Sequence, residues 1–420
     1  MIFNSIKEKI LFYTFPVILF SLIPFFLITG PFLSDFAVSL IALLFLVYCF
    51  KKKNFTYFKN KYFYFFLIFW LYLLFNSMIN NFNIDSLKIS FFYFRYGIFV
   101  VAIVSLLEVN DKFIKYFFYI IFICFVALIF DGFYEYFFEE TSDRVSSFFN
   151  DEKILGSYLS RLWPIFFGLS IFVFKREKKL FPIFIVAFIL SEALIFLSGD
   201  RTAFFYINLS AIFVILFSKN LIKLRLYTLL SSILLISIIS LINPTAKERV
   251  FDLTVSQMNL TSQKSSEVSS QDESIYVFSK AHTHHYITAY KMFLDNIVLG
   301  VGIKNFRNFC SNKKYEVSEL SCSTHPHNTY IQILAETGIV GFLFLIIILF
   351  YFLKYIFRHL FLKFKGKYYF SDFEICILSG IAIYLWPLVP TGSIFNNWLN
   401  IAMILNLPFL VWSRKSKMYE

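Results

Sequence analysis

The sequence predicts an all-helical protein that crosses a membrane about twelve times. Of the 420 residues, 58% are hydrophobic and 22% are aromatic, whereas only 16% are charged, and the mean hydropathy is +0.68. This composition is typical of a polytopic membrane protein. A β-barrel would need short segments of alternating polarity, but the apolar runs here are continuous, so helices are expected to satisfy the backbone in lipid.

Twelve apolar runs are long enough to cross the hydrocarbon of a bilayer. They lie at Ile10–Thr29, Phe36–Phe50, Tyr62–Ile79, Ser86–Leu107, Tyr116–Phe130, Ile154–Phe174, Leu180–Leu197, Thr202–Phe217, Leu226–Ile242, Ile339–Ile356, Phe373–Val389 and Asn397–Trp412. No small-residue cleavage site follows the first run, and the second run comes at once. We therefore expect the first run to be retained and not removed as a signal peptide.

Cations follow the even-numbered runs, and this predicts the orientation of the chain. They are Lys51, Lys52, Lys53, Lys59, Lys61, Lys175, Arg176, Lys178, Lys179, Lys219, Lys223, Arg225, Lys354, Arg358, Lys363, Lys365, Lys367, Arg414, Lys415 and Lys417. Because cytoplasmic loops are enriched in Lys and Arg, both termini are expected in the cytoplasm. The net charge of +12 follows from this topology, so no nucleic-acid partner is needed to explain it.

One long hydrophilic segment, residues 244–338, divides the chain into three parts. Residues 1–243 are expected to form transmembrane helices one to nine, and residues 339–420 helices ten to twelve. The segment between them is expected to form a cap outside the cytoplasm. It holds five of the six histidines, which are His282, His284, His285, His325 and His327. It also holds Cys310 and Cys322, for which an oxidising compartment favours a disulfide over two free thiols.

The segment ends in the most informative motif, His327-Asn328 followed after nine residues by Gly338-x-x-Gly341. The pattern predicts an amphipathic helix on the outer surface over residues 328–337, after which the glycines let the chain turn and pack closely. His327 is expected at the start of that helix, where the positive dipole end favours a neutral imidazole. A neutral imidazole suits a general base, but a histidine that only caps the helix or contacts headgroups fits this position equally well.

Several cations lie at the same predicted membrane face. Arg144 and Arg161 flank the start of the sixth run, Arg201 lies in the short turn before the eighth, and Lys88 and Arg95 lie in the fourth. A charge near the hydrocarbon costs about 3 kcal/mol in insertion scales unless it is paired or functional. For Arg144 and Arg201 this favours an anion site, because Arg suits bidentate phosphate contacts. For Lys88 and Arg161, snorkelling to the headgroups is an equally good explanation.

Together these motifs resemble the O-antigen ligase and polymerase family. The resemblance rests on the histidine and glycine signature, the Ser198-Gly-Asp-Arg201 turn, the segment from Arg144 to Gly156, Asp295-Asn296 with Gly300-Val-Gly-Ile-Lys-Asn-Phe306, and the last outer hairpin, Thr391–Trp398. Twelve spans with one large loop before the tenth also match, so the resemblance covers nearly the whole chain. Asp200 stands where the family commonly has Glu, which is a conservative departure.

The resemblance implies a membrane glycosyltransferase of the GT-C type in the bacterial inner (cytoplasmic) membrane, with its active site facing the periplasm. Its donor is expected to be a glycan on undecaprenyl diphosphate. A ligase moves the finished polysaccharide to the lipid A-core oligosaccharide, whereas a polymerase extends a glycan on its lipid carrier. The histidine signature favours the ligase.

The resemblance also implies roles for individual residues. His327 is expected to take the proton from the attacking hydroxyl, while Arg201 and Arg144 stabilise the diphosphate leaving group, with inversion at the anomeric carbon. Arg95 and Lys88 are weaker candidates for the diphosphate. The other substrate-binding candidates are Arg161, His285, His325 and Asn328. The chain has no Asp-x-Asp pair, and its histidines lack a carboxylate-containing set, so neither a metal nor another cofactor is expected.

Two other classes of protein are alternatives. A polysaccharide transporter or lipid flippase also has many spans and intramembrane cations, but it would hold them near the bilayer midplane in symmetry-related halves. A non-catalytic assembly protein would use the loop to bind a partner. An inactive His327→Ala variant would argue against that second alternative.

Overall fold

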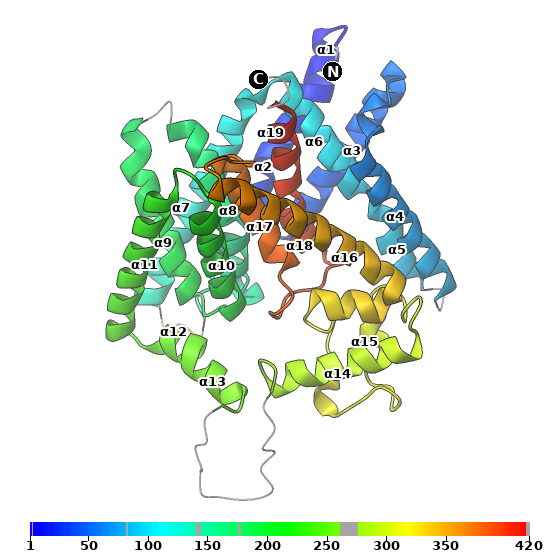
Figure 1. Ribbon diagram of the computed structural model, residues 1–420, viewed down its shortest axis with the longest axis vertical. Coiled ribbons are helices and arrows are strands. Elements are labelled where there is room, and N and C mark those ends of the chain that lie inside the picture. Colours follow the sequence, from blue (N-terminus) through cyan, green and yellow to red (C-terminus); the bar gives the residue numbers. More distant parts are fainter. Residues whose placement is uncertain (2, 81–82, 140–143, 175–177, 261–275, 417–420) are drawn as a thin grey trace, which may run out of the picture.

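The computed structural model describes residues 1, 3–80, 83–139, 144–174, 178–260 and 276–416, and these ranges form helices joined by turns, with no β-strand among them. Lys175, Arg176 and Lys417, which contributed to the predicted orientation, lie outside these ranges. The chain begins and ends at the same end of the helical bundle, and the hydrophilic segment lies at the opposite end (Figure 1). We call that opposite end the loop face.

Each of the twelve predicted runs overlaps a helix. These helices are α2 (Phe15–Thr29), α3 (Pro31–Lys52), α4 (Lys61–Ile79), α5 (Ile84–Phe92) with α6 (Phe94–Val109), α7 (Ile114–Phe138), α8 (Leu155–Phe174), α9 (Phe181–Leu197), α10 (Arg201–Phe217), α11 (Ile222–Ile242), α16 (Thr329–Phe364), α17 (Asp372–Leu385), and α18 (Asn397–Ile404) with α19 (Asn406–Ser416). Seven helical segments within the described ranges are long and apolar enough to cross a membrane. The class of multi-pass membrane protein is confirmed, and the count of twelve spans stays a prediction.

Helix α8 lies at the centre of the bundle and packs against α7, α9, α10 and α17. Several of its large side chains, among them Tyr158, Trp163 and Phe166, are fully buried. Gly168 lets α17 approach closely, since a Cβ there would lie 2.9 Å from the Cβ of Cys376. Helices α4 and α11 lie at the edge and leave most of their apolar surface uncovered, as expected of helices whose solvent is lipid.

A buried ion pair attaches α11 to the bundle. Arg225 on α11 donates to Glu192 on α9 at 2.5 Å, and its guanidinium lies 4.3 Å from the ring of Trp163. The second carboxylate oxygen of Glu192 accepts from Ser232 at 2.6 Å. These additional hydrogen bonds offset part of the cost of holding two charges away from water.

The hydrophilic segment forms a helical cap at the loop face. It contains α12 (Thr245–Lys247), a π-helical turn (Glu248–Asp252), α13 (Leu253–Gln257), α14 (Lys280–Asp295) and α15 (Phe306–Phe309). The cap rests on the first turns of α16 through backbone hydrogen bonds. Val301 N donates to Ala335 O, and Gly302 N donates to Glu336 O, each at 2.9 Å.

Helix α16 bends at Gly338, whose φ of 62° and ψ of −167° interrupt the helical backbone. The interruption lies at the predicted end of the surface helix. A Cβ at Gly338 would lie 2.3 Å from Val298 O, so only glycine allows the cap to approach this closely. On the other side, the Tyr72 hydroxyl of α4 donates to Thr337 O.

The helix before Gly338 does not lie on the surface as predicted. Gln332 is 1% exposed and Glu336 is fully buried. Gln332 Nε2 donates to Ser393 Oγ at 2.9 Å, and Glu336 accepts from Phe306 N at 3.2 Å. The polar face of this helix is therefore covered on one side by the segment between α17 and α18, residues 386–396, which we call the hairpin before α18. The cap covers it on the other side.

Candidate functional site

Four histidine rings meet beneath the cap. His282 and His285 lie one turn apart on α14, and His325 and His327 come from the loop that precedes α16. The ring centroid of His327 lies 4.1 Å from that of His325. It lies 5.4 Å from the centroids of both His282 and His285. Segments about forty residues apart in the chain thus share one cluster, which we call the histidine cluster.

The backbone at His327 is held in an unusual conformation. Its φ of 55° lies in the left-handed region, which costs a non-glycine residue about 1 kcal/mol or more. The His327 carbonyl accepts from Thr391 N at 2.8 Å, and Asn328 follows directly as the N-cap of α16. The hairpin that contains Thr391 therefore stabilises the strained backbone of His327.

The same threonine determines the tautomer of His325. His325 Nε2 lies 3.2 Å from the Thr391 carbonyl, and a carbonyl can only accept, so Nε2 carries the proton. Nδ1 lies 2.9 Å from Thr324 Oγ1 and accepts from that hydroxyl in the neutral ring. His325 therefore has both ring nitrogens engaged. His327 has no hydrogen-bond partner for either ring nitrogen among the described residues.

The histidine cluster is held in the neutral form. Burial, and then the neighbouring histidines, lower the pKa of His327 to about 3. Burial is also the largest cause that lowers the pKa of His325 and of His282, each to about 4. The helix dipole was the expected reason for a neutral imidazole, but burial and mutual repulsion are stronger causes here.

Three arginines gather beside the histidine cluster, and we call them the arginine cluster. Arg201 begins α10, Arg249 lies in the π-helical turn of the cap, and Arg144 precedes α8. Arg201 Nε donates to Arg249 O at 3.0 Å, and Arg201 NH1 donates to Gln257 Oε1 at 2.7 Å. Arg201 is close enough to Arg249 and Arg144 to feel the charge of both, and His282 in turn feels Arg201.

Gly199 allows these arginines to come together. Its φ is 63°, and a Cβ at this position would lie 2.6 Å from Arg249 Cδ and 3.4 Å from Arg144 Cγ. Asp200, which follows, accepts from Ala203 N at 3.1 Å and caps α10. In this turn, Gly199 leaves room for Arg249 and Arg144, Asp200 caps α10, and Arg201 is the third cation.

Two carboxylates on α7 position the segment that contains Arg144. Glu135 accepts from Ser146 N at 3.0 Å and from Ser147 N at 2.5 Å. Asp131, one turn earlier, accepts from Ser147 Oγ at 2.6 Å. Because Ser147 has a φ of 51°, these bonds hold a turn that the backbone would otherwise avoid.

Arg161 lies deeper, on α8, and is only 3% exposed. Its guanidinium lies 4.8 Å from the rings of both Tyr206 and Tyr384, and NH2 donates to Thr391 Oγ1 at 3.2 Å. No carboxylate in the described ranges lies within ion-pair distance of it. Snorkelling to headgroups does not describe this residue, because it supports the hairpin that holds His327.

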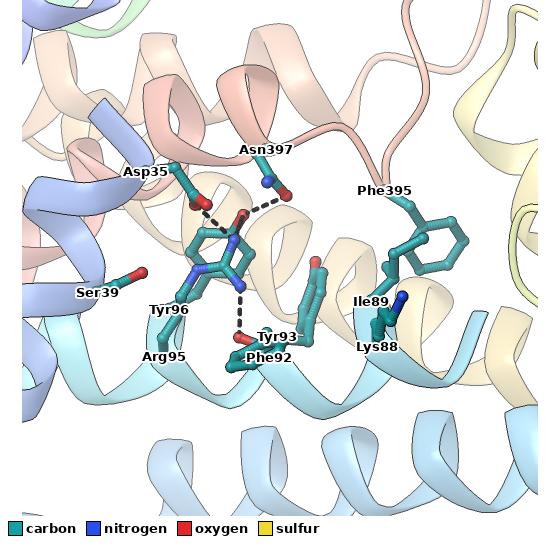
Figure 2. A pocket seen from close by; sticks show the side chains of 10 residues that line it. All are labelled: Asp35, Ser39, Lys88, Ile89, Phe92, Tyr93, Arg95, Tyr96, Phe395 and Asn397. Atoms are coloured by element: carbon teal, nitrogen blue, oxygen red, sulfur yellow. Dashed lines mark hydrogen bonds and ion pairs between the residues drawn. The ribbon is translucent and has the colours of Figure 1, made fainter. Parts of the chain in front are cut away.

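Arg95 and Lys88 are not brought to the histidine cluster. They line a separate cavity of about 290 Å³, and none of the clustered arginines or histidines lines it (Figure 2). Arg95 NH2 pairs with Asp35 at 2.5 Å. Lys88 is 65% exposed at its side chain and lies 3.5 Å from Asp85.

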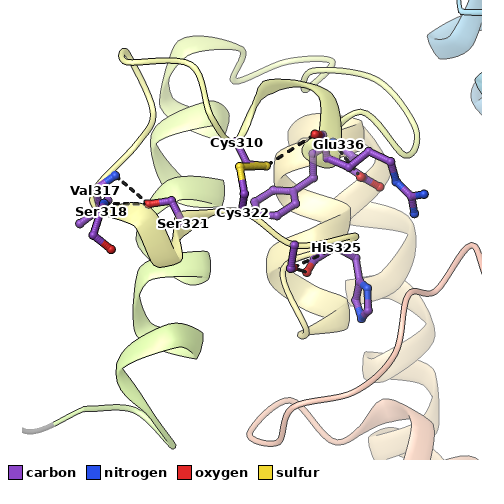
Figure 3. The surroundings of a disulfide bond; sticks show 10 residues. Cys310, Val317, Ser318, Ser321, Cys322, His325 and Glu336 are labelled. Carbon is purple, nitrogen blue, oxygen red and sulfur yellow. Dashed lines mark hydrogen bonds between the residues drawn. A yellow bond between two sulfur atoms is a disulfide. The ribbon is translucent and has the colours of Figure 1, made fainter. Parts of the chain in front are cut away.

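Asn328 and the two cysteines hold the cap together. Asn328 Oδ1 accepts from Tyr330 N and Ile331 N, and its Nδ2 donates to Pro387 O at 2.7 Å. Its amide therefore both caps α16 and anchors the hairpin. A disulfide joins Cys310 and Cys322, whose Cα atoms are 5.0 Å apart, and His325 lies close to it (Figure 3).

Sequence reasoning missed Arg249, His282 and Thr391 as members of the site. Arg249 belongs to no motif that the sequence analysis singled out, and its neighbours Gly199 and Arg144 are remote in the chain. His282 was noted only as one of several loop histidines.

Across the described ranges, no group of three or more His, Cys, Asp or Glu side chains is arranged to hold a metal ion.

Fold and site together define a multi-pass membrane protein with a capped cluster of arginines and histidines at one membrane face. Residues 184–346 match the family model described as O-Antigen ligase, so the family predicted from the motifs is confirmed over those residues. The matched region includes Arg201, Arg249 and the whole histidine cluster. No curated protein matches the chain. The family implies O-antigen ligase or related polymerase activity and groups the chain with enzymes of the membrane glycosyltransferase kind.

Proposed function

We propose that this protein is an O-antigen ligase, which transfers a polysaccharide from undecaprenyl diphosphate to the lipid A-core oligosaccharide at the periplasmic face of the bacterial inner membrane. The observation that carries the proposal is the meeting of the arginine cluster with the histidine cluster under one cap. A polyanionic leaving group and a hydroxyl nucleophile need these two kinds of residue side by side.

The arginine cluster binds the diphosphate in this proposal. Arg201, Arg249 and Arg144 repel one another when the site is empty, so binding of an anion relieves that repulsion. Negative charge grows on the leaving oxygen as its bond to the anomeric carbon breaks, and fixed guanidinium groups stabilise that charge. The mechanism therefore assigns no step to a metal ion.

His327 acts as the general base. Its ring nitrogens make no hydrogen bond within the described chain, so they are available to the acceptor hydroxyl. The acceptor oxygen attacks the anomeric carbon from the side opposite the diphosphate, its proton passes to the imidazole, and the sugar to diphosphate bond breaks with inversion. Bound diphosphate adds negative charge nearby and raises the pKa of His327 toward the range where a base is effective.

His325 and Thr391 act through His327. Thr391 N holds the His327 carbonyl, Thr391 O holds His325 Nε2, and Arg161 contacts the Thr391 hydroxyl. We propose that His325, Thr391 and Arg161 position His327. Asn328 caps α16 and serves the same purpose. His285 lines the side of the site where the acceptor binds.

The test is the lipopolysaccharide of a deletion strain complemented with this chain or its variants. The proposal expects polymer on the lipid A core with the wild-type chain, and its loss with accumulation of lipid-linked polymer for His327→Ala and Arg201→Ala. Lys313→Ala, which removes an exposed cation from the same cap, serves as the control and should behave as the wild type. A core that carries a single repeat unit in the deletion strain would identify the polymerase instead.

A further inference from the structure

The separate cavity that Arg95 and Lys88 line lies beside the hairpin before α18, between α3, α5, α6 and α18 (Figure 2). Its volume of about 290 Å³ lies near the lower limit of small-molecule sites, so it suits one ring-sized group and not a whole lipid. It is lined by Asp35, Ser39, Lys88, Ile89, Phe92, Tyr93, Arg95, Tyr96, Phe395 and Asn397.

The polar groups of this cavity are arranged around Arg95, which is 7% exposed. Arg95 NH2 donates to Asp35 at 2.5 Å and to the Tyr96 hydroxyl at 3.2 Å. The Tyr96 hydroxyl donates to Asn397 Oδ1 at 3.1 Å. Arg95 Nε has no hydrogen-bond partner in the described chain, and a buried donor without a partner costs about 1 to 3 kcal/mol.

Charge in the cavity argues against a phosphate. Arg95 is paired with Asp35, and Lys88 lies next to Asp85, so neither cation is uncompensated. A carboxylate facing the cavity would also repel an anion. The donors and acceptors that remain are the Ser39 hydroxyl, the Asn397 amide group and a carboxylate oxygen of Asp35. This mixture suits a neutral group with several hydroxyls.

Aromatic faces complete the lining. Tyr93 and Phe395 stand with ring centroids 6.3 Å apart, and Tyr96 lies 5.1 Å from Tyr93. Flat apolar rings next to a few hydrogen-bonding groups match a sugar ring, which has C–H faces and hydroxyl edges.

The hairpin connects this cavity to the histidine cluster. Phe395 and Asn397 line the cavity, and Thr391 contacts His327 and His325. Because Phe395 lies four positions after Thr391 in the chain, their Cα atoms lie at most about 14 Å apart. An oligosaccharide of a few rings can span that distance.

We infer that this cavity is an acceptor subsite, which holds one sugar ring of the acceptor glycan while a hydroxyl further along the same glycan reaches His327. The inference rests on the proposed function and adds to it where acceptor specificity lies. The donor diphosphate stays with the arginine cluster, none of whose residues lines this cavity.

Purified full-length protein tests this inference with two probes, undecaprenyl-diphosphate-linked polysaccharide as donor and rough lipopolysaccharide, lipid A-core without polymer, as acceptor. Ser39→Phe fills the cavity from α3. Leu43→Phe adds the same ring to α3 at a position that is 57% exposed to lipid and serves as the matched control. Initial rates give KM for each substrate, and microscale thermophoresis gives Kd for the rough lipopolysaccharide.

Ser39→Phe is expected to raise the acceptor KM and Kd about tenfold, with donor KM and kcat within twofold of wild type. Leu43→Phe is expected to change neither constant. An unchanged acceptor KM and Kd in folded Ser39→Phe protein would overturn the inference, as would a rise in the donor KM alone. Asn397→Ala, which removes an amide from the rim, gives the same test if Ser39→Phe does not fold. If the wild-type protein binds the acceptor without transferring polymer, the proposed function is contradicted but the subsite is not. If the wild-type protein does not bind the acceptor, the subsite is contradicted.

Discussion

At the scale of single residues, the loop face brings together arginines and histidines from distant parts of the chain. The motifs singled out Arg144, Arg201 and His327, and the structure places all three at one end of the bundle. Arg249 was not predictable, because its role depends on Gly199 leaving space for it. Thr391 was not predictable either, since it acts mainly through its backbone atoms.

Arg249 gives the first prediction. Arg249→Ala is expected to reduce transfer by about a hundredfold or more, because one fixed donor to a developing anion is typically worth that much. Arg249→Lys is expected to recover only part of the activity, since Lys keeps the charge but not the bidentate geometry. Rates of polymer transfer to rough lipopolysaccharide by purified protein measure both. Near-normal activity of the alanine variant would remove Arg249 from the site.

The histidine cluster predicts how stability depends on pH. The ordinary pKa of histidine is 6.5, whereas His327 is lowered to about 3 and His282 and His325 to about 4. Between about pH 4 and 6.5 the unfolded chain therefore binds more protons than the folded one, so the free energy of unfolding falls as the pH falls. The stabilisation is fully present above pH 6.5 and is lost progressively below it.

Thermal unfolding of detergent-solubilised protein between pH 7.5 and 4.5 measures this effect. We expect Tm to decrease with acidity in the wild type. A His282→Gln and His325→Gln double variant, which removes two of the shifted groups, should lose less of its Tm over the same interval. Equal decreases in the two proteins would show that other groups, such as carboxylates, cause the acid sensitivity.

At the scale of elements, apolar runs predicted the helices well but not their breaks. The fourth run divides at Tyr93 into α5 and α6, and the twelfth divides at Leu405 into α18 and α19. The break at Leu405 lies three residues before Pro408, which has no N–H to donate to the Ile404 carbonyl. No proline or glycine lies at Tyr93, so local sequence gives no signal for that break. The helix before Gly338 was correctly located but wrongly placed on the surface, because periodicity cannot reveal that a distant hairpin covers its polar face.

The bend in α16 gives a prediction with an internal control. Both glycines have a positive φ, 62° at Gly338 and 69° at Gly366, but the ψ of −167° at Gly338 lies in a region that essentially only glycine adopts. Only at Gly338 would the new Cβ also meet backbone, 2.3 Å from Val298 O, while nothing lies within 4 Å at Gly366. We expect Gly338→Ala to lower Tm and membrane abundance much more than Gly366→Ala. Similar losses in the two variants would contradict both the glycine-only backbone and the close packing of the cap at Gly338.

At the scale of the whole molecule, the cysteines offer a test of the proposed orientation of the cap. The three cysteines outside the cap, Cys49, Cys124 and Cys376, are buried. The disulfide of the cap closes a loop with a sequence separation of 12, for which chain entropy gives a stabilisation of about 3 kcal/mol. Such a bond persists on the oxidising side of the membrane.

This arrangement predicts a labelling pattern. A membrane-impermeant maleimide added to spheroplasts should not label the native protein, but should label it after mild reduction at Cys310 and Cys322. The double variant Cys310→Ser and Cys322→Ser should stay unlabelled in both conditions. Labelling that requires inverted vesicles would reverse the proposed orientation.

The hairpin before α18 has a consequence for how such proteins diversify. Its first half, around Thr391, supports the reacting imidazole, whereas its second half, at Phe395 and Asn397, faces the separate cavity. Exchanging only the second half between related chains should therefore transfer the preference for one recipient sugar. The catalytic activity itself should stay unchanged. A single residue inserted into the hairpin, by contrast, would shift both halves together. We expect such a variant to be inactive with every recipient sugar.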